Sequence, residues 1–334
     1  MAPKLSVLYI GGTGVISTAC VHESVAQGHA VSVLNRGTSD GSGREPLPSE
    51  VRRIHADVSD PESVRRALGN QQFDVVATFR NFVPSQVQQD IDLFRGRAGQ
   101  YVFISSASAY QTPPARLPIT ESTPLRNPHW QYSRDKIACE DLLVAANRET
   151  GFPMTIVRPS HTYDPTLVPF DGGWTVIERM RQGKEVIVHG DGTSLWTLTH
   201  HKDFARAFVG LLGQPRTLGE AFQITSDETL PWNAIYQTLA HAAGVEPRLV
   251  HVPSDAIAAL DPEWGSALLG DKAHSVMFDN SKVKAVVPGW QARIPFAKGA
   301  WEIVEWHDAD KARRQVDARF DALFDALADR FRIS

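Results

Sequence analysis

A tyrosine and a lysine lie four residues apart, as Tyr132 and Lys136, in a segment whose spacing predicts a helix. Side chains four residues apart share one face of a helix, so the ammonium group can stabilise a phenolate beside it. An unperturbed tyrosine has a pKa near ~10, and proton transfer at neutral pH needs a drop of roughly 3 units, or about 4 kcal/mol. The pair therefore predicts proton transfer, with Tyr132 as the general acid/base. Because this spacing also arises by chance, it needs support from other segments.

Serines close the apolar run that precedes this segment. The predicted strand Tyr101–Ser105 is followed by Ser106 and Ser108. A hydroxyl group at this strand end can bind a substrate oxygen beside Tyr132, and we expect Ser106 to do so. Serines at the end of a strand also commonly form turns, which is the alternative interpretation.

A glycine-rich turn joins the first predicted strand, Leu5–Ile10, to a predicted helix over Val15–Gln27. Glycines let the backbone approach a pyrophosphate closely, and the free N–H groups at the helix start attract its negative charge. The strand–turn–helix order favours this function over an ordinary tight turn. Ser17 stands where the third glycine of the pattern usually lies, and its small side chain is compatible with helix–strand packing. The residues predicted to contact the dinucleotide here are Gly11, Thr13, Gly14, Val15 and Ile16.

The end of the second predicted strand, Ala30–Leu34, bears on the choice between NAD and NADP. An acidic side chain at this point binds the ribose hydroxyls of NAD, but here Asn35 precedes Arg36. An arginine can pair with the 2′-phosphate of NADP, so NADP(H) is favoured and NAD(H) is the alternative. Asp57 and Val58 follow the third strand and are predicted to lie beside the adenine, although a capping role for Asp57 is equally open.

These residues need a parallel sheet to bring them together. Over roughly the first 160 residues, strand-like runs rich in Val, Ile, Leu and Phe alternate with helical segments. Nearly continuous apolar strands are typical of a parallel sheet that helices cover on both faces. We predict an α/β fold, with a Rossmann-type doubly wound domain over residues 1–165. Residues 166–334 are predicted to form mainly a smaller substrate-binding lobe, with room for some segments to return to the sheet and a last helix over about Asp310–Phe331.

The composition limits the possible partners. The 334 residues are 42% apolar and 22% charged, with a net charge of −4. Without a basic cluster a nucleic-acid partner is not expected, and no apolar run approaches the roughly 20 residues of a membrane helix. Cys20 and Cys139 are too few for a disulfide framework and fit a reducing compartment. We therefore expect a cytoplasmic protein. We expect no metal site, because no pair of His or Cys on one element has suitable spacing.

Together these motifs resemble those of the NAD-dependent epimerase/dehydratase family, the extended short-chain dehydrogenases/reductases. GGTGVIS at residues 11–17 is similar to the family's GGTGFIG, FISSASAY at residues 103–110 to its SSxxxY strand end, and YSRDK at residues 132–136 to YxxxK. Residues 190–205 resemble GDGxxxRxxxHVDDVA, and residues 279–290 resemble DxSKxxxxLGW. The resemblance extends over nearly the whole chain.

The resemblance implies a role for each residue of the site. Tyr132 would be the general acid/base, Lys136 would hold the nicotinamide ribose and lower the tyrosine pKa, and Ser106 would orient the reacting oxygen. Hydride would pass between the nicotinamide and a secondary alcohol carbon. It also implies a homodimer paired through the tyrosine-bearing helix and the helix before it. The other expected cofactor contacts are Phe79, Arg80, Ser105, Tyr132, Lys136, Pro159 and His161, with a plain surface position equally open for Arg80.

Departures from the family pattern narrow the range of expected substrates. Dehydratases carry an Asp-Glu pair where this chain has Ala107-Ser108, so a 4,6-dehydratase is not expected. Nucleotide-sugar epimerases place an arginine on the substrate pyrophosphate where Trp196 stands here. A second arginine of the family has no match, and Lys272 and His274 are the nearby substitutes. We therefore expect a small, sugar-like substrate, with a packing role for Trp196 equally open. The expected substrate contacts are Ser108, Tyr163, Asp164, Trp196 and His200.

Three functions remain open from the sequence. The first is an NADP(H) oxidoreductase. Arg36 favours it, because this arginine indicates NADP(H), and loosely held NADPH suits net reduction. The second is an NAD-dependent sugar or nucleotide-sugar epimerase that retains its cofactor. The third is a non-catalytic dinucleotide-sensing or RNA-associated protein on the same fold. Intact Ser106, Tyr132 and Lys136, and the absence of a basic cluster, argue against the third.

Overall fold

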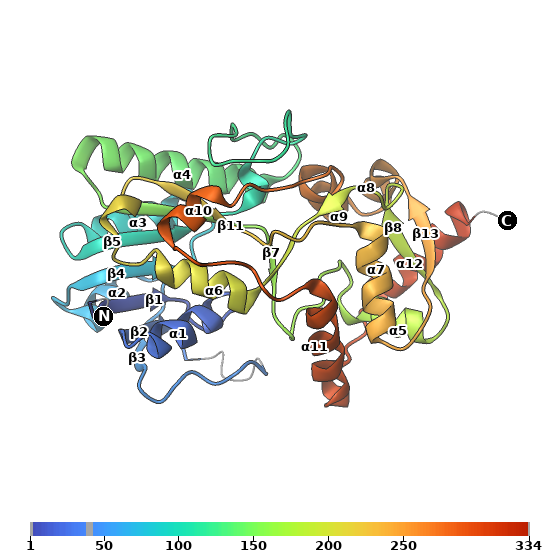
Figure 1. The fold of residues 1–334 in the computed structure, drawn as a ribbon, viewed down its shortest axis with the longest axis horizontal. Coiled ribbons are helices and arrows are strands. Elements are labelled where there is room, and N and C mark those ends of the chain that lie inside the picture. The colour runs from blue at the N-terminus through green and yellow to red at the C-terminus, as the bar shows by residue number, and fades with distance from the viewer. Residues whose placement is uncertain (1–2, 38–42, 333–334) are drawn as a thin grey trace.

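The structure of the protein, a computed structural model, describes residues 3–37 and 43–332. An α/β domain occupies one side of the molecule, and a smaller lobe extends from it (Figure 1). The α/β domain contains a seven-stranded parallel sheet in the order β11-β6-β5-β4-β1-β2-β3. The strands are β1 (Ser6–Ile10), β2 (Ala30–Asn35), β3 (Arg52–His55), β4 (Phe73–Thr78), β5 (Ala98–Ile104), β6 (Met154–Pro159) and β11 (Ala221–Ile224). The predicted Rossmann-type fold is confirmed.

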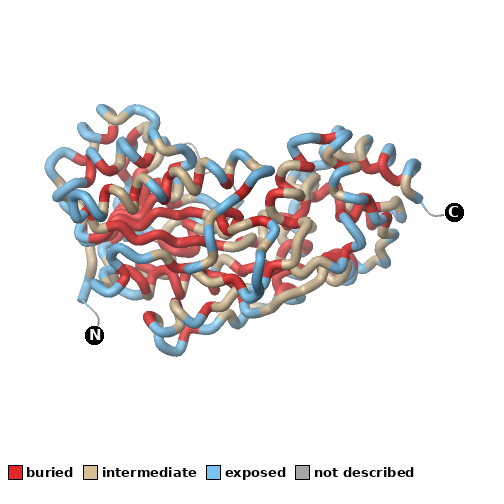
Figure 2. Tube along the Cα trace, turned by 90° about the horizontal axis from the view of Figure 1, so that it is seen from above, coloured by how far each residue is buried: buried red, intermediate tan, exposed pale blue. Residues whose placement is uncertain are grey.

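Helices cover both faces of this sheet, which explains the apolar strands. On one face the buried side chains come from α1 (Ser17–Ala26), α6 (His201–Gly210) and α10 (Ser281–Val286). On the other face they come from α2 (Pro61–Leu68), α3 (Pro84–Phe94) and α4 (Gln131–Thr150). Figure 2 shows the sheet as a block of buried chain with exposed turns around it. Strands covered on both faces have no polar side, so they read as continuous hydrophobic runs.

The smaller lobe is built from helices and three two-stranded sheets, and its core is separate from those of the α/β domain. The strand pairs are β7 (His161–Tyr163) with β10 (Leu198–His200), β8 (Glu185–His189) with β13 (Arg248–Val252), and β9 (Leu195–Trp196) with β12 (Leu230–Pro231). Its helices are α5 (Trp174–Arg181), α7 (Trp232–Ala242), α8 (Ser254–Leu260), α9 (Pro262–Ala267), α11 (Phe296–Asp308) and α12 (Ala318–Phe331). A π-helical turn over Leu268–Lys272 follows α9 directly.

Segments far along the chain complete the α/β domain. Strand β11 pairs with β6 at the sheet edge, and α6 packs against α1. These elements come after residue 165, so the chain crosses between the two parts more than once (Figure 1). The site at the junction is therefore framed by residues from both halves of the sequence.

The C-terminal helix is shorter than the sequence predicts. A 3-10 turn covers Lys311–Arg313, and α12 begins only at Ala318. The Asp317 side chain accepts hydrogen bonds from the N–H groups of Arg319 and Phe320 and so caps the new helix start. Val316, which lies inside the predicted helix but before the start of α12, is 47% exposed. Within the described residues, no helix is both long and apolar enough to cross a membrane.

Candidate active site

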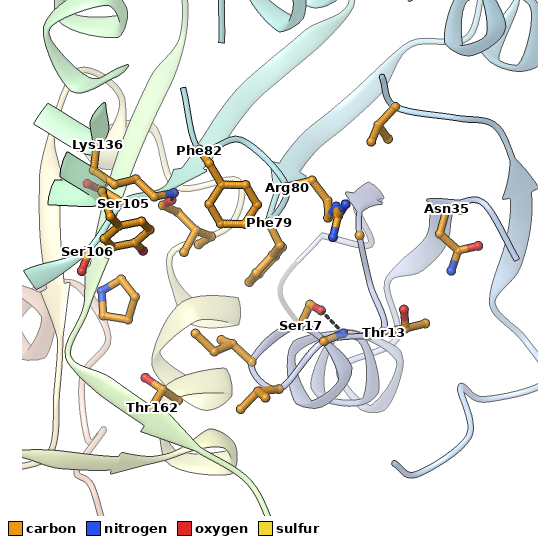
Figure 3. A pocket seen from close by; sticks show the side chains of 18 of the residues that line it. Thr13, Ser17, Asn35, Phe79, Arg80, Phe82, Ser105, Ser106, Lys136 and Thr162 are labelled. Atoms are coloured by element: carbon orange, nitrogen blue, oxygen red, sulfur yellow. Dashed lines mark hydrogen bonds between the residues drawn. The ribbon is translucent and has the colours of Figure 1, made fainter. Parts of the chain in front are cut away.

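A cleft of about 840 Å³ lies at the carboxyl ends of the parallel strands, and the segments that follow β1 to β6 line it. In open α/β sheets ligands bind at this edge, where the strand order reverses. Figure 3 shows Thr13 and Asn35 toward one end of the cleft and Ser106 and Lys136 toward the other. The cleft is lined by every residue predicted to contact the cofactor except Asp57, namely Gly11, Thr13, Gly14, Val15, Ile16, Asn35, Arg36, Val58, Phe79, Arg80, Ser105, Tyr132, Lys136, Pro159 and His161.

The glycine turn has the shape that a bound pyrophosphate requires. Gly11 has a φ of 83°, a conformation that residues with a side chain rarely adopt. A Cβ atom on Gly12 would lie 2.7 Å from Cγ2 of Val33, so only glycine fits between the turn and β2. The turn leads into the start of α1, where free N–H groups attract anions. These residues fit the pyrophosphate of a dinucleotide.

Ser17 explains how the turn does without a third glycine. Its side chain is buried, and its Oγ accepts a hydrogen bond of 2.9 Å from the Gly14 N–H (Figure 3). The Thr18 hydroxyl donates to the Gly14 carbonyl at 2.9 Å. The serine therefore replaces the small glycine and also fixes the turn from the helix side.

At the adenosine end of the cleft, Arg36 is exposed and forms part of the lining. Its neighbour Asn35 uses its side-chain oxygen to accept from the Gly37 N–H at 3.0 Å, which shapes the bend after β2. The Asp57 carboxylate lies outside the lining and accepts from the N–H and hydroxyl of Ser59 at 3.0 and 2.7 Å. Asp57 therefore stabilises a turn beside the cleft, while Asp60 caps α2, and a contact of Asp57 with adenine stays a prediction.

At the opposite end, Lys136 is buried and held by the backbone. Its Nζ donates to the carbonyls of Asn81 and Ile104 at 2.7 and 2.8 Å, and lies 5.8 Å from the centre of the Tyr132 ring. Burial lowers the pKa of Lys136 to about 8. The two carbonyls keep the ammonium group at the cleft wall, beside the tyrosine.

The pKa of Tyr132 differs from the sequence-based expectation. Burial raises it to about 12, while a hydrogen bond with Ser106 opposes the shift. The lysine that was expected to lower this pKa directs its ammonium to backbone carbonyls instead. In this arrangement the phenol is protonated at neutral pH, which suits a proton donor.

Serine hydroxyls form a chain behind Tyr132. The Ser133 hydroxyl donates to Ser108 Oγ at 2.7 Å, and the hydroxyls of Ser108 and Ser106 lie 2.9 Å apart. The Ser108 N–H also donates to Ser106 Oγ at 3.2 Å. Either hydroxyl of the Ser106–Ser108 pair can be the donor, and when Ser108 donates, the Ser106 proton is free for an oxygen in the site.

A buried network fixes the Asn81 carbonyl that holds Lys136. The Asn81 amide donates to Asp90 Oδ2 at 2.6 Å, and the Tyr101 hydroxyl donates to the same oxygen at 2.7 Å. Burial raises the pKa of Asp90 to about 6. The sequence did not indicate this network, because its members come from α3, β5 and the loop between β4 and α3.

An ion pair anchors α4 to the sheet and was also missed. Arg158 in β6 contacts Glu140 through two nitrogens, with Nη2 2.6 Å from Oε2 and Nε 3.0 Å from Oε1, and both side chains are buried. The Ser105 hydroxyl donates to Glu140. Because Glu140 lies one helical turn after Lys136, this pair sets the position of the helix that carries Tyr132. An arginine within an apolar strand was the available signal.

Three residues predicted to contact the substrate lie away from the two cavities next to Tyr132. Tyr163 is buried against His200 and Phe296. His200 is also buried, and its Nε2 lies 2.8 Å from Glu302. Asp164 accepts from Arg44 Nε at 2.7 Å. His200 and Asp164 thus have charged partners within the protein, whereas the Tyr163 hydroxyl is buried without a hydrogen-bond partner among the described residues.

A second pocket, of about 320 Å³, adjoins the cleft at Ser106 and Tyr132. Ser108 and Trp196, two of the predicted substrate contacts, line it, and His161 lines both cavities. Trp130, Thr197, Asp271 and Lys272 also line this pocket. Of these, the sequence singled out only Lys272. Trp130 lies directly before α4, and Thr197 and Asp271 gain their positions from the folding of the lobe. Among the described residues, no group of three or more His, Cys, Asp or Glu could hold a metal ion.

The fold and the two adjoining cavities are those of a Rossmann-type protein with an added lobe. The profile of the NAD dependent epimerase/dehydratase family matches residues 7–225. The chain belongs to this family, as the motifs predicted.

Individual relatives are distant. The chloroplast stem-loop binding protein of 41 kDa b from Arabidopsis thaliana is 26% identical over 255 residues, covering 73% of this chain and 65% of that protein. A UDP-glucose 4-epimerase from Lactobacillus helveticus is 28% identical over 170 residues, covering 46% and 51%. The chain thus spans about two thirds and one half of these relatives. The UDP-glucose 4-epimerase from Bifidobacterium longum, solved with NAD+ and UDP, has a TM-score of 0.72 at 19% identity, covering 91% and 98% of the chains. This last likeness shows the fold alone.

Proposed function

We propose that the protein is an NAD(P)-dependent oxidoreductase that moves a hydride to or from an alcohol or ketone carbon of a small, sugar-like substrate. One observation carries the proposal: Ser106 and Tyr132 line both the long cleft and the smaller pocket. A dinucleotide in the cleft and a substrate in the pocket would meet at these two side chains. NADP(H) is the favoured cofactor and NAD(H) the alternative.

The chain's own residues then divide the work. Bound dinucleotide supplies or accepts the hydride. Tyr132, kept protonated by burial, gives its proton to the oxygen of the carbonyl being reduced, and takes it back in the reverse direction. Ser106 donates a hydrogen bond to the same oxygen. Lys136, held by two carbonyls, positions a positive charge beside the phenol and favours the phenolate left after proton transfer.

Epimerisation with retained cofactor is the second candidate, and the epimerase among the relatives favours it. The test is to purify the protein and measure by chromatography any dinucleotide that heat releases. We expect the purified protein to contain little bound dinucleotide and to bind NADPH when NADPH is added in solution. Stoichiometric NAD in the purified protein would contradict net reduction and favour epimerisation.

The choice of NADP rests on one cation. Changing Arg36 to alanine should weaken NADP+ binding by about 10- to 100-fold, because a charge-assisted hydrogen bond is worth about 1.5–3 kcal/mol. NAD+ binding should change little. Calorimetric titration of both nucleotides gives the comparison, and Arg148→Ala, an exposed arginine of α4 outside the cleft lining, is the matched control. An equal loss for both nucleotides would remove the argument for NADP.

A cytoplasmic homodimer paired through α3 and α4 remains part of the proposal. The stem-loop binding relative raises RNA association as a further possibility, but the net charge of −4 does not favour a nucleic-acid surface.

A further inference from the structure

Unpaired polar groups gather around the smaller pocket. The indole nitrogen of Trp196 and the hydroxyl of Thr197 are buried and have no hydrogen-bond partner within the described part of the chain. The two residues are only 3% and 1% exposed. Buried polar groups are nearly always hydrogen-bonded, so orphaned ones beside a cavity point to a ligand that satisfies them.

Two charged residues add to this set from the π-helical turn. In residues 3–37 and 43–332, neither the Asp271 carboxylate nor the Lys272 ammonium has a hydrogen-bond or ion-pair partner. Lys272 is nearly buried, with its Nζ 5.7 Å from the centre of the Trp130 ring. Single π-helical turns occur frequently at functional sites. This one places an acceptor and a donor of opposite charge side by side.

One acidic and one basic residue, Asp271 and Lys272, line the smaller pocket. Burial raises the pKa of Asp271 to about 6, which leaves it ionised at pH 7 and opposite in sign to Lys272. Burial and the charge of Lys272 lower the pKa of His161 to about 3, so that ring is neutral. Asp171 acts on Asp271 as a further negative charge. A diphosphate would therefore meet one ammonium group beside a carboxylate that repels it.

The size of the pocket points the same way. Its volume of about 320 Å³ is at the lower end of the roughly 300–1,000 Å³ typical of small-molecule sites. Side chains that donate and side chains that accept hydrogen bonds both line it, and Val276 and Phe278 provide an apolar surface. A sugar ring offers the matching combination of hydroxyl groups and C–H edges.

We propose that this pocket binds an uncharged, monosaccharide-sized polyol without a nucleotide diphosphate, with Asp271 accepting from its hydroxyl groups and Lys272 donating to them. The inference rests on the proposed function, since it places the substrate's reacting carbon beside Tyr132. Trp196 and Thr197 would complete the hydrogen bonds from the wall formed by β9 and the residue after it.

Direct binding tests the size and charge of the ligand. The intact protein, saturated with NADP+, is titrated calorimetrically with glucose, galactose, mannose and sorbitol, and in parallel with glucose 6-phosphate, glucuronate, UDP and UDP-glucose. We expect at least one neutral sugar to bind, its charged counterparts to bind more weakly, and UDP not to compete with it. Tighter binding of UDP, UDP-glucose or an anionic sugar would overturn the proposal, as would failure of every neutral sugar to bind.

A variant that removes the charge of Asp271 tests whether this residue binds the sugar. Asp271→Asn should weaken binding of the neutral sugar about tenfold or more, as expected for hydrogen bonds to a charged group. Asp255→Asn, an exposed aspartate of α8, is the matched control and should bind normally. NADP+ affinity and melting temperature show that the variant is folded, and an unchanged sugar affinity in folded Asp271→Asn would reject the role.

The two proposals fail in different ways. If the protein prefers UDP-glucose, the proposed neutral sugar is rejected as the substrate class, while the proposal of hydride transfer with Tyr132 as proton donor is unaffected. If Tyr132→Phe retains full turnover, the catalytic proposal falls, whereas sugar binding at Asp271 is still measured without any reaction.

Discussion

Replacing Tyr132 with phenylalanine is expected to lower kcat by about 10²–10⁴-fold, the usual contribution of a general acid/base. Dinucleotide affinity should be nearly unchanged, because the variant keeps the ring that lines the cleft and loses only the hydroxyl. Oxidation of NADPH with the carbonyl compound that the natural protein reduces best gives the rate, and calorimetry gives the affinity.

Tyr163→Phe is the control for this experiment. Its hydroxyl is buried without a partner among the described residues, and Tyr163 lines neither the cleft nor the smaller pocket. Activity should be kept, although the sequence predicted a substrate contact there. Full turnover in Tyr132→Phe would reject Tyr132 as the proton donor. If only Tyr163→Phe lost turnover, the proton donor would be Tyr163 and not Tyr132.

The largest effect on stability is expected from Arg158→Met. Removing this guanidinium leaves the Glu140 carboxylate, which is 2% exposed, buried without its charge partner. Breaking a buried ion pair in this way costs about 3–5 kcal/mol, so the free energy of unfolding should fall by that amount. Urea denaturation at neutral pH measures the change.

The double variant Glu140→Leu/Arg158→Met separates charge burial from loss of packing. Replacing both members of a buried pair by apolar side chains is often close to neutral, so much of the lost stability should return. Some loss should remain, because Ser105 donates a hydrogen bond to Glu140. A single variant that is as stable as the natural protein would show that the pair does not anchor α4.

The expected rank order follows from position. Tyr132 lines the cavities and is the proposed proton donor, whereas Arg158 and Glu140 lie behind it and hold α4 against β5 and β6. Activity should therefore respond more strongly to Tyr132, and stability more strongly to Arg158. A variant that changed both equally would indicate that the site and the helix anchor are one unit.

The sequence by itself determined the sheet and the cofactor side of the cleft. The relevant patterns are local: continuous apolar strands, the glycine turn at Gly11 and the helical spacing of Tyr132 and Lys136. Local patterns can be recognised without knowing which segments pack together. Since loops after successive parallel strands meet at one edge of the sheet, knowing the strands was enough to bring these segments together.

Only the tertiary structure decided the smaller pocket beside Tyr132 and the pKa values. Asp271 and Lys272 line the smaller pocket together with Tyr132 because the lobe places the π-helical turn there. The family resemblance drew attention to Lys272, but no spacing in the sequence indicated Asp271. Burial raised the pKa of Tyr132 where proximity to a lysine predicted a fall, since desolvation depends on everything packed around the phenol. Sequence patterns report neighbours along an element, whereas burial and charge depend on neighbours in space.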